Sequence, residues 1–401
     1  MPAPRVSEWR KLPLSLTELC IETTLRCGQS FRWRKIDDEW NCVLHGRLVS
    51  LKQDKDYLHY KVTWPKTTPN RQRPPAGPKV KHRGGDEDDT EALLRHYFSL
   101  KHDLAALYDQ WSESDLNFRK KAPKFTGIRI LSQDAWEALV AFICSSNNNI
   151  SRITQMVDKL CAHYGPFIAR IGDEAFHDFP SPQALAGRKV EAHLRELGFG
   201  YRAKYIAETA ILVSAIKPDG WLESLTNPEN PGFEVTVPTD GQEAATYRKA
   251  HEQLLSLSGV GPKVADCVCL MGLGWGEAVP VDTHVWQIAQ RDYKFGKTKT
   301  KTFSKVMYDS VGDHFRTIWG PQAGWAQSVL FTANLKSFSE QLVEKSEEAD
   351  IKVKVEEAIT TQVGTKSRKR RVSVVEKVKV EEPLAAETGR AQRKRRRTTR
   401  S

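Results

Sequence analysis

The sequence lacks the long apolar segments that mark membrane and secreted proteins. None of its apolar runs approaches the ~20 residues that a membrane-spanning helix needs, and residues 1–19 contain no apolar stretch of the kind found in secretory signal peptides. We therefore expect a soluble, intracellular protein with no membrane partner.

Cysteine patterns are also missing. The seven cysteines are an odd number, and no two of them form a C-x-x-C pair. This spacing argues against a disulfide framework, a cysteine-rich zinc site and an iron–sulfur cluster. We expect free, mostly buried thiols in a reducing compartment, with no metal and no cofactor.

The last 61 residues lack aromatic side chains altogether. Residues 341–401 contain no Phe, Trp, Tyr or Cys, yet they carry +7 of the chain's net charge of +11. Such a stretch has little apolar surface with which to offset the entropy lost on ordering. We expect residues 341–401 to form a disordered basic tail.

What is present before the tail predicts an α+β protein. Short segments rich in aromatic and β-branched residues, separated by turn residues, predict an antiparallel sheet; these segments are Gln29–Lys35, Trp40–His45, Arg47–Gln53 and Tyr57–Trp64. Proline and charge in 65–89 predict a flexible loop. From Thr90 onward the apolar spacing is helical. We expect a sheet domain over 1–130, a helical region over 131–340 and an inserted loop over 217–243.

The most informative helical segment is a hairpin within 246–272. Gly259 and Gly261 flank Val260 and predict a tight turn, and Pro262 suits the first position of a new helix. Main-chain N–H groups at such a helix start bind anions, including nucleic-acid phosphates. An ordinary corner between two helices is the alternative, but the surrounding L-x-x-L-x-G-V-G-x-K-x-A pattern favours phosphate binding.

Lys263 at the start of the second helix is a candidate nucleophile. A lysine there opposes the helix dipole, and burial would lower its pKa, which favours the neutral amine. Cys267 lies one turn further on the same face, where its thiol can contact Lys263 or a ligand. Asp266 lies three residues further along, so the alternative is an exposed Lys263–Asp266 ion pair with no function. The residue pattern alone does not favour one of these two interpretations over the other.

Asp282 follows the extended segment Val279–Val281 and is a good helix N-cap. A capping carboxylate beside a lysine nucleophile is also placed to stabilise a developing cationic sugar. His284 is either a structural residue or a phosphate contact. This stretch has too few ligands for a metal site.

Six segments together resemble one enzyme family. They are Gly28–Trp33, Phe142–Ile150, Leu197–Ala203, the 246–272 hairpin, Pro280–Asp282 and Ala323–Phe331. Over residues 10–340 the chain resembles the eukaryotic-type 8-oxoguanine DNA glycosylase/abasic-site lyases of the helix–hairpin–helix glycosylase superfamily. The resemblance implies a TATA-binding-protein-like N-terminal sheet, all-α glycosylase domains, and double-stranded DNA with 8-oxoguanine opposite cytosine as the substrate of a monomeric enzyme.

The resemblance also implies a role for each site residue. Lys263 attacks the sugar and forms a Schiff base, and Asp282 supports the cationic sugar. Around the flipped base, Gly28 accepts from N7–H, Gln327 binds the Watson–Crick edge, and Phe331 and Cys267 sandwich the ring. On the opposite strand the cytosine contacts and the aromatic wedge are Asn147, Arg152, Arg202 and Tyr201. His284, Gly259 and Gly261 contact phosphates.

Some features leave other interpretations open. Phe331 and Trp325 are also plausible core residues, and 147–149 a capping turn. Thr283 stands where the family pattern predicts an apolar residue, and the stretches 65–89 and 217–243 are longer than the family requires. A related glycosylase with another damaged-base preference is the enzymatic alternative. A damage-binding module without catalysis is the other, although binding alone requires neither Lys263 nor Asp282.

The tail carries two basic clusters, Lys366–Arg371 and Arg393–Arg397. They predict either a nuclear import signal, recognised by an import receptor, or a DNA-contacting arm. We expect nuclear localisation, with a mitochondrial fraction as a further option. Two V-K-V-E copies resemble acceptor sites for a ubiquitin-like modifier, centred on Lys354 and Lys379.

Overall fold

The computed structural model of the chain describes residues 4–65, 88–235, 244–296, 304–336 and 338. The predicted tail, residues 66–87 of the predicted loop and residues 236–243 of the insertion lie outside these ranges.

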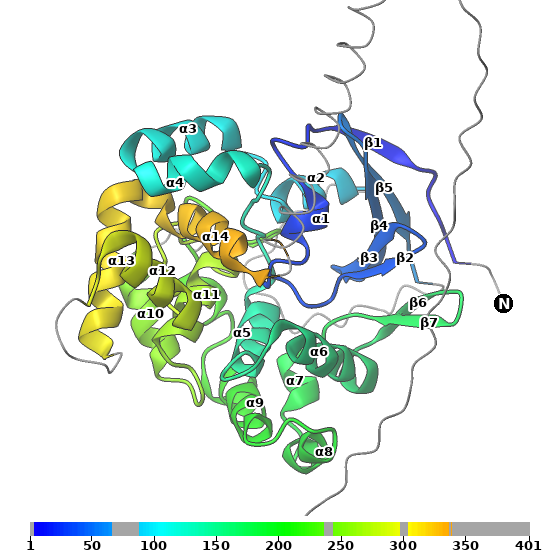
Figure 1. The fold of residues 1–401 in the computed structure, drawn as a ribbon. Coiled ribbons are helices and arrows are strands. Elements are labelled where there is room, and N and C mark those ends of the chain that lie inside the picture. The colour runs from blue at the N-terminus through cyan, green and yellow to red at the C-terminus, as the bar shows by residue number, and fades with distance from the viewer. Residues whose placement is uncertain (1–3, 66–87, 236–243, 297–303, 337, 339–401) are drawn as a thin grey trace, which may run out of the picture. The chain divides into compact units, whose positions relative to one another are not determined.

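An antiparallel sheet forms near the N-terminus, as predicted (Figure 1). Its five strands are ordered β1-β5-β4-β3-β2, with bounds β1 Arg10–Pro13, β2 Arg34–Ile36, β3 Glu39–Leu44, β4 Arg47–Gln53 and β5 Tyr57–Thr63. In β5 the residues alternate between buried and more exposed positions, the pattern of a half-buried strand. The prediction of a strand over Gln29–Lys35 was wrong for most of its length, because residues 27–31 form a turn whose aromatic Phe31 is buried in the helical core.

The two faces of the sheet are covered differently. One face packs against helices α1 and α2 in a core that includes Leu58, Tyr60 and Leu94. On the other face, Val43 and Leu48 contact a second hairpin, β6 Phe167–Ile171 and β7 Glu174–His177, which reaches the sheet from the helical region (Figure 1). This hairpin was not predicted, because an irregular register between Phe167 and Ala169 breaks the alternation of its residues.

The rest of the described chain is mainly helical, as predicted. The helices are α1 Ile21–Thr24, α2 Thr90–Tyr97, α3 Leu104–Ser114, α4 Leu116–Lys121, α5 Ala135–Cys144, α6 Ile150–Tyr164, α7 Pro182–Leu185, α8 Val190–Glu196, α9 Arg202–Ile211, α10 Tyr247–Leu255, α11 Pro262–Met271, α12 Thr283–Tyr293, α13 Lys305–Trp319 and α14 Ala323–Asn334. Helix α9 ends at Ile211, and the chain continues as a π-helical turn, Leu212–Ile216. No described helix has the length and apolarity to span a bilayer.

Helix α11 lies at the centre of the helical core (Figure 1). Every residue from Val264 to Met271 is buried, so this helix is enclosed on all sides. Apart from Asp266 these side chains are apolar, as is usual in a fully enclosed helix. The same core includes Trp111 of α3 and Phe118 of α4, although both residues lie within 1–130, the range predicted for the sheet domain. Because α11 is held on every side, the residues at its N-terminus have a fixed position.

Candidate functional site

A cavity of about 420 Å³, its open mouth included, lies between α11, α14 and the 27–29 turn. We call it the base cavity. It is lined by Cys27, Gly28, Gln29, Phe142, Lys263, Cys267, Met271, Pro280, Asp282, Gln327, Ser328, Phe331 and Thr332. The structure thus brings together both candidate catalytic residues and all four candidate base-binding residues. These six residues come from segments up to 303 positions apart, since Gly28 and Phe331 are both among them.

Lys263 is the second residue of α11, directly after Pro262 at the first helical position. Its ammonium nitrogen Nζ donates to the Ser145 hydroxyl at 3.3 Å, and it lies 5.0 Å from the centroid of the Phe142 ring. Both partners belong to the end of α5. The lysine is half-buried, with its nitrogen held at the wall of the base cavity.

Asp266 does not form the surface ion pair that the sequence left open. It is 1% exposed, and its carboxylate accepts hydrogen bonds from Tyr247 at 2.5 Å and from Tyr308. The exposed Lys263–Asp266 pair is therefore excluded, because the carboxylate is buried within the helical core. Burial also raises the pKa of Asp266, a direction that the two tyrosine hydroxyls oppose.

Cys267 contributes a neutral thiol to the base cavity. It is 2% exposed, and burial raises the pKa of the thiol to about 11, although the neighbouring Lys263 ammonium lowers it. Near pH 7 the side chain is therefore SH rather than thiolate. A neutral sulfur is a polarizable surface suited to packing against a flat ring.

Asp282 is the N-cap of α12, as its position after an extended segment predicted. One carboxylate oxygen accepts from the Val285 N–H at 2.9 Å. Thr283 begins the helix and is exposed, so the absence of an apolar residue there leaves the cap intact. The cap fixes the orientation of the carboxylate at the wall of the base cavity. His284 is exposed and sets its ring edge-on to Phe331, with 6.0 Å between centroids.

The two hairpin glycines serve different purposes. Gly259 has a φ of +77°, and a Cβ atom there would lie 2.4 Å from the Tyr205 ring, so only glycine fits. Gly261 has an extended backbone as the N-cap of α11, and no heavy atom lies within 4 Å of where its Cβ would be. The space beside Gly261 leaves room for a ligand to approach the main-chain N–H groups at the helix start.

Three of the four candidates for the opposite strand, Asn147, Tyr201 and Arg202, form a cluster next to the base cavity. Tyr201 is 47% exposed and donates to the Ser146 carbonyl at 3.1 Å. Arg202 is 4% exposed; it donates to that carbonyl and, at 3.1 Å, to the carbonyl of Asn147. Its guanidinium lies 4.6 Å from the Tyr201 ring centroid. Ser146 directly follows Ser145, the hydrogen-bond partner of Lys263. The cluster and the candidate nucleophile are therefore bonded to consecutive residues of the chain.

The asparagine run contains the capping turn that was the alternative interpretation above. Asn149 is the N-cap of α6 and accepts from the Arg152 N–H at 3.0 Å, which confirms the capping turn for that residue. Asn147 adopts a φ of +48°, one of the conformations that asparagine tolerates best. Arg152 is exposed in the first turn of α6.

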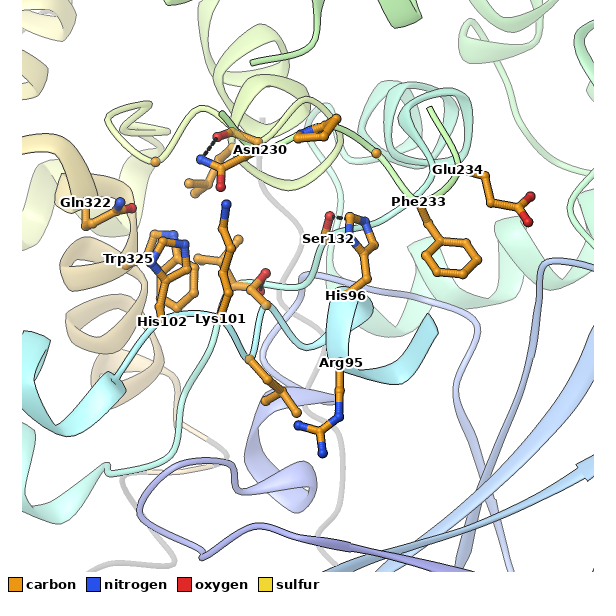
Figure 2. A pocket seen from close by; sticks show the side chains of 18 residues that line it. Arg95, His96, Lys101, His102, Ser132, Asn230, Phe233, Glu234, Gln322 and Trp325 are labelled. Atoms are coloured by element: carbon orange, nitrogen blue, oxygen red, sulfur yellow. Dashed lines mark hydrogen bonds between the residues drawn. The ribbon is translucent and has the colours of Figure 1, made fainter. Parts of the chain in front are cut away.

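A second, larger cleft of about 1200 Å³ lies on the other side of α11 and α14. In Figure 2, Lys101 stands between the pair formed by His102 and Trp325 and the pair formed by His96 and Ser132. The Lys101 Nζ donates to the Glu229 carbonyl at 2.9 Å. Burial lowers the pKa of His96 to about 4. This cleft was not predicted, because part of its wall is the inserted loop.

Sequence reasoning assigned no role to several residues at the base cavity, among them Gln29, Phe142, Ser145 and Thr332. Each lies next to or inside one of the quoted motifs, and this proximity was the available signal. Trp325 is 5% exposed and packs in the core, as its alternative interpretation stated. Within the ranges that the structure describes, no three His, Cys, Asp or Glu side chains gather as metal ligands would.

Comparisons with known proteins place the chain among related sequences and structures. Residues 11–139 match the family described as 8-oxoguanine DNA glycosylase, N-terminal domain, and residues 140–309 match the HhH-GPD superfamily base excision DNA repair protein. The N-glycosylase/DNA lyase of Saccharomyces cerevisiae is 39% identical over 81% of this chain and 86% of its own. The N-glycosylase/DNA lyase OGG1 of Arabidopsis thaliana is 35% identical over 86% of this chain and 87% of its own.

Among solved structures, the Clostridium acetobutylicum 8-oxoguanine glycosylase/lyase bound to double-stranded DNA has a TM-score of 0.60 at 23% identity. The match covers 79% of this chain and 91% of that one. This likeness shows a shared fold.

The fold and the hairpin define the chain as a base excision DNA repair protein of the helix–hairpin–helix class. More narrowly, it belongs to the N-glycosylase/DNA lyase family whose N-terminal domain is that of 8-oxoguanine DNA glycosylase. It is therefore a DNA repair enzyme, a DNA glycosylase with lyase activity, and DNA is its partner.

Proposed function

We propose that this enzyme flips 8-oxoguanine out of its pair with cytosine, excises it with Lys263 as the nucleophile, and then cleaves the abasic strand. The carrying observation is that Lys263 and Asp282 line one cavity together with Gly28, Cys267, Gln327 and Phe331. The matching N-terminal domain family and the Clostridium acetobutylicum enzyme are both named for 8-oxoguanine, which supports the choice of base.

In the first chemical step, the Lys263 nitrogen bonds to the sugar C1′ while the bond from C1′ to the base breaks. The base leaves with the bonding electrons and takes up a proton. Positive charge develops on the sugar at this point, and the Asp282 carboxylate, oriented by its cap, stabilises it. The C1′–O4′ bond then breaks as the C1′=N bond forms, and O4′ takes up the remaining amine proton, so the sugar ring opens and a Schiff base is produced.

In the second step, loss of a proton from C2′ expels the 3′ phosphate oxygen and breaks the strand by β-elimination. The Schiff base makes that proton acidic, because the electrons left on C2′ are delocalised toward the nitrogen. No water molecule is needed for base release, and the same lysine serves both steps.

Base recognition rests on a single hydrogen atom. 8-Oxoguanine carries a hydrogen on N7, where guanine has an acceptor, so the Gly28 carbonyl would bond to the first and repel the second. A buried acceptor left without its donor discriminates strongly, by roughly 10⁴–10⁵-fold in favourable sites. Gln327, at 6% exposure, would bind the Watson–Crick edge. Phe331 and the neutral Cys267 thiol would hold the two ring faces.

Flipping a base costs a few kcal/mol of stacking and pairing. Tyr201, exposed beside the cavity, would fill the gap in the duplex. Asn147, Arg152 and Arg202 would contact the cytosine, whose O2 and N3 accept the hydrogen bonds that arginine only donates. His284 and the N–H groups at Gly259 and Gly261 would bind the backbone phosphates.

We also propose that the basic clusters of the tail direct the enzyme to the nucleus through an import receptor, and that the enzyme acts as a monomer. A fusion of residues 341–401 to a fluorescent protein tests the first claim. Nuclear accumulation that is lost when Arg393–Arg397 are replaced by alanine is the expected result, and an unchanged distribution would contradict it.

Borohydride trapping tests the proposed chemistry. Wild type, Lys263→Gln and the control Lys101→Gln are each incubated with a duplex that carries one 8-oxoguanine opposite cytosine. We expect a covalent adduct with wild type and the control only, and a loss of base excision of about 10⁴-fold or more in Lys263→Gln. An adduct in all three proteins would place the nucleophile on another amine. Base release without any adduct would make water the nucleophile, and preference for an alkylated base would favour the related-glycosylase alternative.

A further inference from the structure

The turn that carries Gly28 has no regular secondary structure to hold it. It lies between α1 and β2, with a φ of +84° at Gly28. A Cβ atom there would approach Ile150 Cδ1 at 3.0 Å, so the position is tightly enclosed. The direction of the Gly28 carbonyl therefore depends on what holds the two neighbouring residues.

Gln29 is held by a two-bond clamp. It is 3% exposed. Its side-chain oxygen accepts from the Leu131 N–H at 2.9 Å, and its amide nitrogen donates to the Arg129 carbonyl at 2.9 Å. That nitrogen also contacts the Cys27 sulfur at 3.4 Å. Although Gln29 lines the base cavity, both ends of its amide are already bonded to the protein, so it is suited to position its neighbour rather than to bind the base.

The clamp is connected to one of the helices that form the cavity and lies beside the other. The Gln133 side chain donates to the Gln29 carbonyl at 3.0 Å, and the Gln133 N–H donates to the carbonyl of Met271, the last residue of α11, at 2.7 Å. On the other side of the turn, Cys27 lines the base cavity together with Thr332 of α14. The turn is thus bonded to the end of α11 through Gln133 and shares the cavity wall with α14.

We infer that Gln29, with support from Gln133, is a positioning residue that sets the Gly28 carbonyl against the N7–H of 8-oxoguanine and so determines base specificity. This inference rests on the proposed function. A shift of about 1 Å at a reacting or recognising group can reduce a rate by roughly 10²-fold. An abasic site has no base to recognise, so its cleavage by Lys263 does not require the Gly28 carbonyl.

The experiment compares two activities of one variant, Gln29→Met. Single-turnover excision of 8-oxoguanine opposite cytosine should fall by about 10–100-fold. Cleavage of a duplex that already contains an abasic site should stay within about twofold of wild type, and the excision rate of 8-oxoguanine relative to guanine should fall. The matched control is Gln53→Met. Gln53 also clamps backbone, accepting from Ile21 N–H at 3.0 Å and donating to the Leu19 carbonyl at 2.6 Å, but it does not line the cavity.

A general loss of structure would reduce both activities in parallel, and that result, like the retention of both, would overturn the inference. If Gln29→Met does not fold, Gln133→Met serves in its place, because it removes only the bond from the Gln133 side chain to the Gln29 carbonyl. We expect it to reduce excision more than abasic-site cleavage as well, but with a smaller difference between the two activities. Wild type that fails to prefer 8-oxoguanine over guanine would refute the proposed function instead. Wild-type preference with an unchanged Gln29→Met would refute the positioning role alone.

Discussion

The two cavities on either side of α11 and α14 differ in what their walls offer. The larger cleft holds about 1200 Å³ and the base cavity about 420 Å³. Residues close together on one helix line different cavities. On α11, Leu270 lines the cleft and Met271 lines the base cavity; on α14, Trp325 lines the cleft and Gln327 lines the base cavity. The cleft is the larger of these two (Figure 2), but the reactive side chains lie in the smaller cavity.

The reason lies in the state of the polar groups. In the larger cleft the Lys101 ammonium is bonded to a main-chain carbonyl, and His96 contacts the Ser132 hydroxyl at 2.8 Å. Burial lowers the pKa of both His96 and His102, so these rings are neutral near pH 7. In the base cavity an amine, a capped carboxylate and the Gly28 backbone line one space. Converging reactive groups, rather than volume, mark the site.

The largest effect that tests this comparison is expected at Asp282, whose side chain caps α12 and would also stabilise the cationic sugar. Asp282→Asn keeps a good N-cap, whereas Asp282→Ala removes it at a cost of about 1 kcal/mol in unfolding free energy. Both variants lose the charge that would stabilise the cationic sugar, so we expect excision to fall by about 10²–10³-fold in each. Chemical denaturation and single-turnover assays measure the two effects. Wild-type activity in Asp282→Asn would show that Asp282 is only a cap.

A smaller effect is expected at Phe331, which would stack on the flipped base. Stacking of a base on an aromatic ring is worth about 1–3 kcal/mol, so Phe331→Ala should reduce 8-oxoguanine excision by roughly 5–150-fold while abasic-site cleavage is preserved. The control is Phe233→Ala in the larger cleft, where Phe233 packs against His45 and His96. Equal losses of excision in the two variants would mean that the comparison between the cavities is wrong.

The smallest effect concerns stability in the larger cleft. Burial lowers the pKa of His96 from 6.5 to about 4. Between those values the unfolded chain binds a proton that the folded protein excludes, so stability falls as the pH falls from 6.5 toward 4. His96→Gln removes this dependence, and the slope of unfolding free energy against pH should flatten by up to about 1 kcal/mol per unit. Urea denaturation at several pH values measures the slope, and parallel curves would contradict the assignment.

Local patterns predicted many elements correctly. The cap at Asp282 and the proline at the start of α11 are both found as expected, because each depends on residues within one or two turns. The strand β1 and the β6–β7 hairpin were missed. Their pairing depends on partners distant in the sequence, and short strands with a bulge or a terminal proline show little alternation.

At the site, too, local features were predictable from the sequence and features that depend on packing were not. Lys263 and Cys267 fall on one face of a helix whatever surrounds it, and this much was predictable from spacing alone. Asp266, on that helix, was not: its burial between Tyr247 and Tyr308 depends on α10 and α13 packing around α11.

The helix starts, the hairpin, the candidate nucleophile and the family can be recognised in the amino-acid sequence, because short-range geometry and motif spacing encode them. The folded structure was needed to show that Gly28 and Phe331 line one cavity, that Gln29 is bonded on both sides, and that the inserted loop forms part of the wall of a second cleft. These features depend on which apolar faces pack together. Such packing is a property of the whole core, since each buried side chain is placed by neighbours from distant parts of the chain.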